Sequence, residues 1–365
     1  MQILENGVIC RKPDSFFGYF GWGSVARIDT HTLVAACSGE RTAHICPWGK
    51  TELFYSYDDG RTWSQPTVIN DTVLDDRDAG IVHLGGDKLL LTWFNHPLRY
   101  CERPSGDENR DRMVSAYMDV GEPYDVKNHG SHVRLSYDRG FSWTPAQKLE
   151  VSSPHGPCVL ADGTILYLGK TMYSDKHPRD LAAYLDHSEP IMTYMSHDGG
   201  LTWEEGGIVP EPEGCPYEYL HEPHAIQLPS GRIVGMIRLS GPKPGDTPYD
   251  KGFSMFTTWS DDGGYTWTKP VYTDVSGSPP HLLLHSSGAL ICSYGRREVP
   301  FGERVMISYD EGKTWAKDFE LFHGEDGDLG YPCSVELFDG SILTVYYQKF
   351  PGDTKDSFLY THWTL

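Results

Sequence analysis

The sequence predicts an all-β fold, a six-bladed β-propeller, and three of its features lead to that fold class. A turn motif, S-x-D-x-G-x-[ST]-W, occurs five times. Six pairs of apolar segments, each joined by a short turn, alternate with these motifs. Each end of the chain carries one further strand-like segment. Internal repetition of this kind is typical of repeat architectures such as propellers.

The turn motif itself has the chemistry of a tight turn between two strands. Its copies occupy residues 56–63, 136–143, 196–203, 260–267 and 308–315. The aspartate can accept hydrogen bonds from amides of its own turn, and the glycine tolerates a positive φ. The motif also resembles the start of a calcium loop, but no glutamate recurs at the position that such a loop requires. We therefore interpret these aspartates as structural and expect no metal there.

The paired apolar segments predict the inner two strands of each blade. They lie at residues 25–36, 81–93, 158–167, 225–236, 282–292 and 335–345. In five blades a turn motif supplies the outer two strands. The sixth blade has no motif, so we expect residues 358–363 as its third strand and residues 3–10 as its outer fourth. This pairing closes the ring of one propeller domain over residues 1–365 and removes a free sheet edge.

Two long insertions interrupt this pattern. Residues 96–130 and 171–190 are polar and rich in turn-forming residues, and they fall between the second and third strands of blades two and three. We expect these loops on the face opposite the turn motifs, where a propeller binds its ligand.

Composition and charge exclude several classes of partner. The 365 residues are 39% hydrophobic and 22% charged, as in a globular chain with a large core. A formal net charge of −20 argues against nucleic acid and anionic membranes as partners. No apolar run is long enough to span a bilayer, and no signal peptide is visible, so we expect a cytoplasmic protein. The eight scattered cysteines should then be reduced thiols.

With these features, the chain resembles the sialidase (neuraminidase) superfamily of glycoside hydrolases, whose propellers are built from BNR, or Asp-box, repeats. Two blade starts add to the likeness. Tyr331 opens the segment Y-P-C-S-V at the last blade, and Glu222 lies in H-E-P-H-A-I-Q-L with Arg238 sixteen residues later. The resemblance implies the sialidase fold and an enzyme that cleaves a terminal sialic acid or a related acidic sugar from glycans, without a cofactor.

The resemblance also assigns catalytic roles, with Tyr331 as the nucleophile and Glu222 as its base. A phenol is a poor nucleophile unless a carboxylate takes its proton. A neutral tyrosine also avoids bringing a charged nucleophile to an anionic sugar, which is why sialidases depart from the usual pair of carboxylates.

Blade one departs from the family pattern. Residues 21–25, where the family carries the first arginine of its carboxylate-binding triad, contain none. His44 stands closest to the place of the family's acid/base aspartate and can transfer protons near neutral pH. Asp78, at the head of blade two, is a second candidate for this role. The arginines expected to position the substrate are Arg41, Arg77, Arg238 and Arg297.

Three histidines at the starts of first strands, His155, His224 and His281, should point toward the central funnel and contact the substrate. They have no close metal-ligand spacing, so we expect no metal. Two alternatives stay open. One is a glycosidase or lyase that acts on a different acidic or deoxy sugar through its histidines. The other is a non-catalytic glycan-binding propeller, which the missing arginine favours and the set of Tyr331, Glu222 and Arg238 disfavours.

Overall fold

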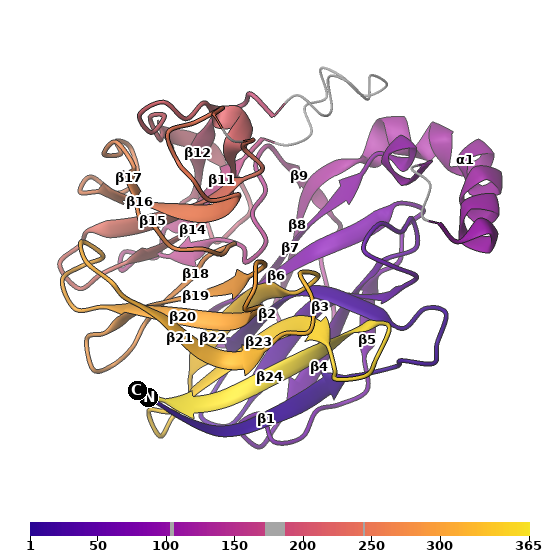
Figure 1. The fold of residues 1–365 in the computed structure, drawn as a ribbon, viewed down its shortest axis with the longest axis horizontal. Coiled ribbons are helices and arrows are strands. Elements are labelled where there is room, and N and C mark those ends of the chain that lie inside the picture. Colours follow the sequence, from indigo (N-terminus) through magenta and orange to yellow (C-terminus); the bar gives the residue numbers. More distant parts are fainter. Residues whose placement is uncertain (103–105, 172–186, 244) are drawn as a thin grey trace.

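A computed structural model shows how the chain is arranged and describes residues 1–102, 106–171, 187–243 and 245–365. Over these residues the strands form six four-stranded antiparallel sheets, arranged as blades around a ring (Figure 1). The predicted six-bladed β-propeller is therefore confirmed.

The first three blades follow the chain without crossovers. Blade one contains β2 (Tyr19–Arg27), β3 (Leu33–Arg41), β4 (Lys50–Ser56) and β5 (Thr67–Asn70). Blade two contains β6 (Asp75–Gly85), β7 (Lys88–His96), β8 (Gly130–Ser136) and β9 (Gln147–Leu149). Blade three contains β10 (Cys158–Val159), β11 (Ile165–Lys170), β12 (Ile191–Ser196) and β13 (Glu204–Ile208).

The last three blades complete the ring. Blade four contains β14 (Leu220–Gln227), β15 (Ile233–Ser240), β16 (Phe253–Ser260) and β17 (Val271–Tyr272). Blade five contains β18 (His281–Leu284), β19 (Leu290–Arg296), β20 (Gly302–Ser308) and β21 (Ala316–His323). Blade six contains β22 (Gly330–Glu336), β23 (Ile342–Lys349), β24 (Asp356–Thr364) and β1 (Gln2–Cys10).

The two ends of the chain share blade six. The outer strand β1 pairs antiparallel with β24, so that Gln2 lies opposite Thr364, and the termini are adjacent in Figure 1. Both edges of β24 are thereby paired, since β23 lies on its other side. An unpaired edge there would expose a row of backbone hydrogen-bonding groups.

The core consists of apolar clusters between neighbouring blades. Six clusters of buried side chains each join two adjacent blades, for example Phe54 of blade one with Phe358 of blade six, whose ring centroids are 5.9 Å apart. The tryptophan that ends each turn motif packs against one of these clusters. The position of each blade is therefore fixed by apolar burial against its neighbours.

The turn motif closes on itself through hydrogen bonds. In the first copy, Ser56 Oγ accepts from the amide of Gly60 at 2.8 Å and donates to Asp58 Oδ1 at 2.9 Å. The amide and hydroxyl of Thr62 both donate to the Asp58 carboxylate, and the Trp63 indole donates to the Gly60 carbonyl. These bonds use the aspartate within the turn, as its structural interpretation predicts.

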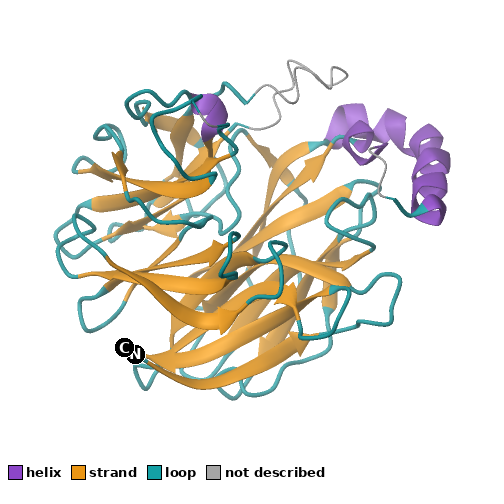
Figure 2. Cartoon of the chain, in the orientation of Figure 1, coloured by secondary structure: helices purple, strands orange, loops and turns teal. Residues whose placement is uncertain are grey.

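The insertion in blade two differs from the prediction. The expected turn-rich loop contains a 3₁₀ helix η1 (Leu98–Glu102) and a helix α1 (Glu108–Asn128) at the rim of the ring (Figure 2). Asp107 caps α1, because its carboxylate accepts from the amides of Asn109 and Arg110. The insertion in blade three lies largely in residues 172–186, outside the described residues.

A short 3₁₀ helix, η2 (Tyr217–Tyr219), leads into β14. The helices in the described part of the chain lack the length and apolar character needed to span a bilayer.

Candidate active site

Four of the first strands, β2, β6, β14 and β22, carry the same irregularity near their start. In each, two residues face one residue of the partner strand, which is a β-bulge. The first of the two has a left-handed backbone, with φ of 53° at Trp22, 56° at Asp78, 43° at Glu222 and 51° at Tyr331. This conformation is uncommon for residues other than glycine, and bulges near active sites redirect side chains.

Tyr331, Glu222 and Arg238 form a hydrogen-bonded set. The Tyr331 phenol donates to Glu222 Oε1 at 2.6 Å, and Arg238 Nη1 donates to the phenol oxygen at 3.0 Å. The same Arg238 nitrogen pairs with the other carboxylate oxygen of Glu222. Arg238 is within reach because it lies opposite His221, the neighbour of Glu222, in the β14–β15 ladder. The structure thus brings together the three residues with the strongest catalytic signal in the sequence.

The surroundings keep the phenol protonated until it reacts. Burial raises the pKa of Tyr331, and the Glu222 carboxylate raises it further, while Arg238 and Arg297 act in the opposite direction. A carboxylate that already accepts the phenol hydrogen bond is placed to take the proton when the oxygen forms a new bond.

Arg297 also lies beside the ring of Tyr331. Its guanidinium carbon is 5.4 Å from the centre of the Tyr331 ring, and its Nη2 donates to the hydroxyl of Tyr347 at 3.1 Å. Arg304, on the following strand β20, pairs with Glu320 at 2.6 Å. Two arginines, Arg238 and Arg297, therefore flank the phenol and can attract a substrate anion.

In blade one a tryptophan stands at the bulge. The buried Trp22 ring contacts the guanidinium of Arg77 at 3.9 Å and that of Arg41 at 4.6 Å. Arg41 has no exposed surface and forms a two-pronged ion pair with Asp75. The expected contact of Arg41 with substrate is therefore corrected, because its charge is already neutralised beneath Trp22.

Arg77 is nearly buried as well, and it faces Asp75 and the neighbouring Asp78 at 3.8 and 3.6 Å. Its guanidinium nevertheless brings a positive charge close to the site, because it packs on the ring of Trp22. The ring of Tyr331 is 6.4 Å from that same ring. Arg77 is thus a cation from blade two next to the position where blade one lacks its arginine.

The two acid/base candidates have different surroundings. The imidazole of His44 is partly exposed, with Nδ1 2.9 Å from Asp328 and its ring 4.9 Å from that of Trp22. The pKa of His44 lies below its ordinary value, because burial lowers it by more than the hydrogen bond to Asp328 raises it. Burial raises the pKa of Asp78 to about 7, against the lowering influence of Arg77.

Three residues of this site have no signature in the sequence. Asp328 accepts hydrogen bonds from the phenols of Tyr19 at 3.2 Å and Tyr347 at 3.3 Å, besides its contact with His44. Together with Trp22 and Tyr331, the two tyrosines form a small buried cluster between blades one and six, separate from the six clusters of the core. No motif in the sequence relates these three residues to His44 or to Tyr331.

The three predicted histidines do lie together, but deeper than expected. Their side chains are nearly buried, and ring centroids are 4.5 Å apart for His224 and His281 and 5.1 Å apart for His155 and His281. His224 Nδ1 accepts the amide of Leu282, and His281 Nδ1 accepts the amide of Ser334. His224 and His281 thus each bind the backbone of the next blade, whereas His155 Nδ1 lies 3.3 Å from the hydroxyl of Ser24 in blade one.

Burial lowers the pKa of all three histidines, so they remain neutral. Their contact with substrate stays a prediction, and the bonds of His224 and His281 show a structural role between blades. Among the described residues, no group of three His, Cys, Asp or Glu side chains could hold a metal ion.

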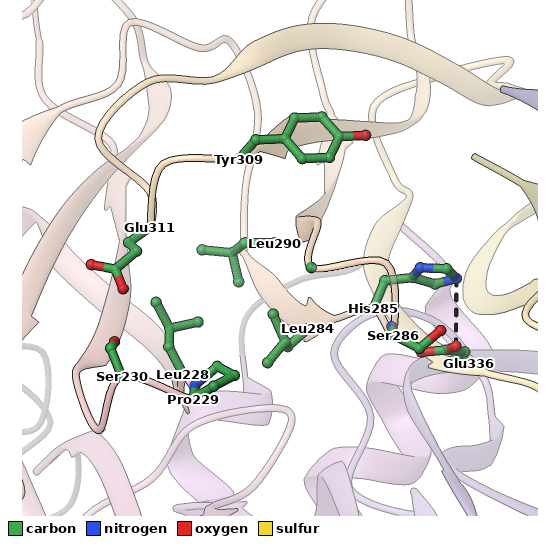
Figure 3. Close-up of a pocket in the computed structure, with 11 residues that line it drawn as sticks. Leu228, Pro229, Ser230, Leu284, His285, Ser286, Leu290, Tyr309, Glu311 and Glu336 are labelled. Atoms are coloured by element: carbon green, nitrogen blue, oxygen red, sulfur yellow. Dashed lines mark hydrogen bonds and ion pairs between the residues drawn. The ribbon is translucent and has the colours of Figure 1, made fainter.

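A separate pocket of about 430 Å³ lies at the opposite end of β14 from Glu222, near the turns that follow β14 and β18 (Figure 3). Leu228, Leu284 and Leu290 give it apolar walls, and Tyr309 and Glu311 come from the turn motif of blade five. None of the predicted site residues lines it.

Comparisons with known proteins agree with this architecture. A family model described as a BNR repeat-like domain matches residues 107–344. No curated protein is close enough in sequence to count as a match.

Solved structures are similar over nearly the whole chain. A protein of unknown function from Dyadobacter fermentans has 21% identity and a TM-score of 0.76, with 100% of this chain and 99% of that chain covered. The intramolecular trans-sialidase from Ruminococcus gnavus, in complex with oseltamivir carboxylate, has 15% identity and a TM-score of 0.63, with 100% and 98% covered.

A mutant of the NanB sialidase from Streptococcus pneumoniae has 15% identity and a TM-score of 0.65, with 98% of this chain and 70% of that chain covered. At such identities the likeness shows the fold alone, which is the sialidase propeller.

Proposed function

This chain belongs to the BNR repeat-like domain family and has the sialidase fold, and from that premise we propose that it is an exo-acting glycoside hydrolase. Its substrate would be a glycan ending in sialic acid or a related acidic sugar. The observation that carries the proposal is the 2.6 Å hydrogen bond from Tyr331 to Glu222, formed between two bulged strands.

In the proposed reaction, Tyr331 attacks the anomeric carbon as its phenol proton passes to Glu222. The glycosidic bond breaks, and His44 or Asp78 protonates the departing oxygen. Water then displaces the tyrosine, and the sugar leaves with retained configuration. A neutral nucleophile suits this substrate because a carboxylate beside the anomeric carbon would repel an anionic one.

The acidic group of the sugar would lie against Arg238 and Arg297, which flank Tyr331. Charge-assisted hydrogen bonds to such groups contribute about 1.5–3 kcal/mol each. The names of two neighbours agree with an acidic ligand, since one is a sialidase and the other a trans-sialidase in complex with oseltamivir carboxylate.

A second candidate substrate is an acidic sugar other than sialic acid, and Trp22 favours it. At this bulge a fully buried Trp22 stands in place of a third arginine, with Arg77 packed on its ring. An indole cannot make the charge-assisted hydrogen bonds by which an arginine binds a carboxylate.

The proposal is tested by assaying the purified protein on fluorogenic sialosides and on aryl glycosides of other acidic sugars, beside Tyr331→Phe. We expect turnover of at least one acidic sugar and loss of nearly all of it in the variant. Wild-type activity in Tyr331→Phe would rule out the nucleophile. Failure to hydrolyse any glycoside, combined with measurable glycan binding, would favour a binding module.

A further inference from the structure

We propose that Asp328 is a positioning residue that orients His44, and that His44 is the acid/base group. A His–Asp pair would then replace the single acid/base aspartate that the family carries near the position of His44. This inference rests on the proposed function and deepens it. It names the proton donor and a partner 284 positions away in the sequence.

The contact between the two side chains is direct. Asp328 Oδ1 lies 2.9 Å from His44 Nδ1. When His44 Nδ1–H donates to this carboxylate, the other ring nitrogen, Nε2, is left for the substrate. A carboxylate in this position fixes the tautomer and the orientation of an imidazole and stabilises its charged form.

Asp328 is itself held in place. The phenols of Tyr19 and Tyr347 donate to its carboxylate, at 3.2 and 3.3 Å. Tyr347 in turn accepts a hydrogen bond from Arg297, the arginine beside Tyr331. The carboxylate that orients His44 is therefore connected to the side chains around the nucleophile.

His44 is also fixed from its backbone side. Its carbonyl oxygen accepts from Arg41 Nη2 at 2.9 Å and from Arg77 Nη1 at 3.3 Å, and its ring packs edge-on against Trp22. With 39% of its side chain exposed, the imidazole remains accessible to a ligand. These contacts give Arg41 a role beneath the site, in place of direct contact with substrate.

The charges around the pair favour an ionised Asp328. Hydrogen bonds from His44 and Tyr19 and the charge of Arg297 lower the pKa of Asp328 against the effect of burial. Burial and the nearby Asp328 raise the pKa of Asp356, so that this second carboxyl stays neutral. The charged and titratable groups facing the pair are Tyr19, Arg77, Arg297, Tyr347, Lys349 and Asp356.

Asp78 is less suited to the same task. Its side chain is only 5% exposed, it faces Arg77 at 3.6 Å, and the Glu222 charge acts on it. The Asp78 carboxyl is thus engaged by the charge of Arg77, whereas the His44 imidazole has 39% of its side chain exposed.

The proton balance of the two steps is complete with these residues. In the first step, His44 Nε2–H gives its proton to the glycosidic oxygen as the bond to the anomeric carbon breaks. The Tyr331 oxygen bonds to that carbon, and the phenol proton moves to Glu222. In the second step, His44 Nε2 takes a proton from water as the water oxygen bonds to the carbon. Glu222 then returns its proton to the released Tyr331.

Asp328→Asn tests the pair through leaving-group chemistry, on whichever acidic sugar the wild type hydrolyses. A glycan linked through a sugar hydroxyl needs an acid, whereas an activated aryl glycoside does not. We expect kcat/KM to fall by about 10–100-fold on the glycan and by less than about three-fold on the aryl glycoside. The basic limb of the pH profile should move to lower pH by about one unit or more, because the imidazolium loses its counter-charge.

The matched control is Glu325→Gln, which removes a charge from an exposed residue of the same loop. We expect it to retain the wild-type pH profile. Equal losses on both substrates in Asp328→Asn, or an unchanged basic limb, would overturn the pair. Absence of turnover by the wild type on every glycoside would overturn the proposed function and the acid/base role with it.

A second measurement does not depend on activity. Nitrogen NMR of the ¹⁵N-histidine-labelled wild-type protein, with the His44 signal assigned from His44→Gln, reports the tautomer directly. We expect neutral His44 to carry its proton on Nδ1. A proton on Nε2 would show that Asp328 does not hold the ring, whatever the kinetics of the variants.

Discussion

The Tyr331 phenol oxygen lies 2.6 Å from Oε1 of Glu222, although the two residues are 109 positions apart and belong to different blades. Both occupy the first position of a β-bulge and both have positive φ. Backbone strain of this kind costs about 1–3 kcal/mol for each residue and concentrates at functional sites. Two strained positions that meet in one hydrogen bond indicate that this contact is the centre of the site.

Glu222→Gln should abolish most activity while leaving the fold intact. The amide can still accept a hydrogen bond from Tyr331, but it cannot take the phenol proton. We expect kcat to fall by about 10²–10⁴-fold, the usual contribution of a general base. Steady-state kinetics with circular dichroism check this, and Glu218→Gln, an exposed glutamate in η2, is the control. A nearly normal kcat in Glu222→Gln would exclude the residue as the base.

Arg297→Met should weaken substrate binding more than it slows chemistry. The variant keeps the aliphatic stem but removes the charge beside Tyr331. A lost charge-assisted contact of about 1.5–3 kcal/mol corresponds to an increase in KM of roughly 10–150-fold. Arg297→Met should raise KM much less for the methyl ester of the substrate, because the ester has no carboxylate charge.

Arg296→Met is the matched control for Arg297→Met, because Arg296 is the adjacent residue and its guanidinium pairs with Asp318. Its KM should stay close to that of the wild type. If both variants raised KM equally, or if the ester were affected as strongly as the acid, Arg297 would not be the carboxylate ligand.

Glu52→Gln should stabilise the protein at alkaline pH. Glu52 on β4 is fully buried, and neither carboxylate oxygen has a hydrogen-bond partner within the described residues. Burial raises its pKa from 4.5 to about 7. Between these two pH values the folded state holds a proton on Glu52 that the unfolded state has lost. The stability that protonation of Glu52 contributes is complete below pH 4.5 and is lost as the pH rises through about 7.

Removing the ionisable group avoids that loss. Urea unfolding near pH 8.5 should show Glu52→Gln to be more stable than the wild type by up to about 3 kcal/mol, with little difference near pH 5. The exposed Glu213→Gln should change neither value. A destabilised Glu52→Gln at pH 8.5 would mean that the carboxylate is ionised and paired in the folded protein.

Much of the fold could be predicted because its elements repeat. Five turn motifs and six hairpins give the blade number, and residues 3–10 were left for the outer strand that β1 forms. Helix α1 could not be predicted from the same kind of pattern. It contains Gly121 and Pro123, which normally interrupt helices, and its residues are mostly polar.

The site was predictable where residue types and spacing carry the chemistry. Glu222 and Arg238 are sixteen residues apart, and the pairing of β14 with β15 brings them close together in space. Asp328 could not be found this way, because nothing in the sequence relates it to His44. For Trp22, the sequence showed only that residues 21–25 contain no arginine. The structure adds that it occupies the first position of the bulge in β2, as Glu222 and Tyr331 do in their own strands.

The most direct test of the central claim is to trap the covalent intermediate and identify the residue that carries it. The reagent is a derivative of the hydrolysed acidic sugar with one fluorine on the anomeric carbon, as leaving group, and one on the adjacent carbon, which slows both steps. The glycosyl–enzyme then accumulates, so that peptide mass spectrometry can locate it. We expect a single adduct, on the oxygen of Tyr331, which is absent from Tyr331→Phe. An adduct on any other residue, or none in a wild-type enzyme that hydrolyses the parent glycoside, would contradict Tyr331 as the nucleophile.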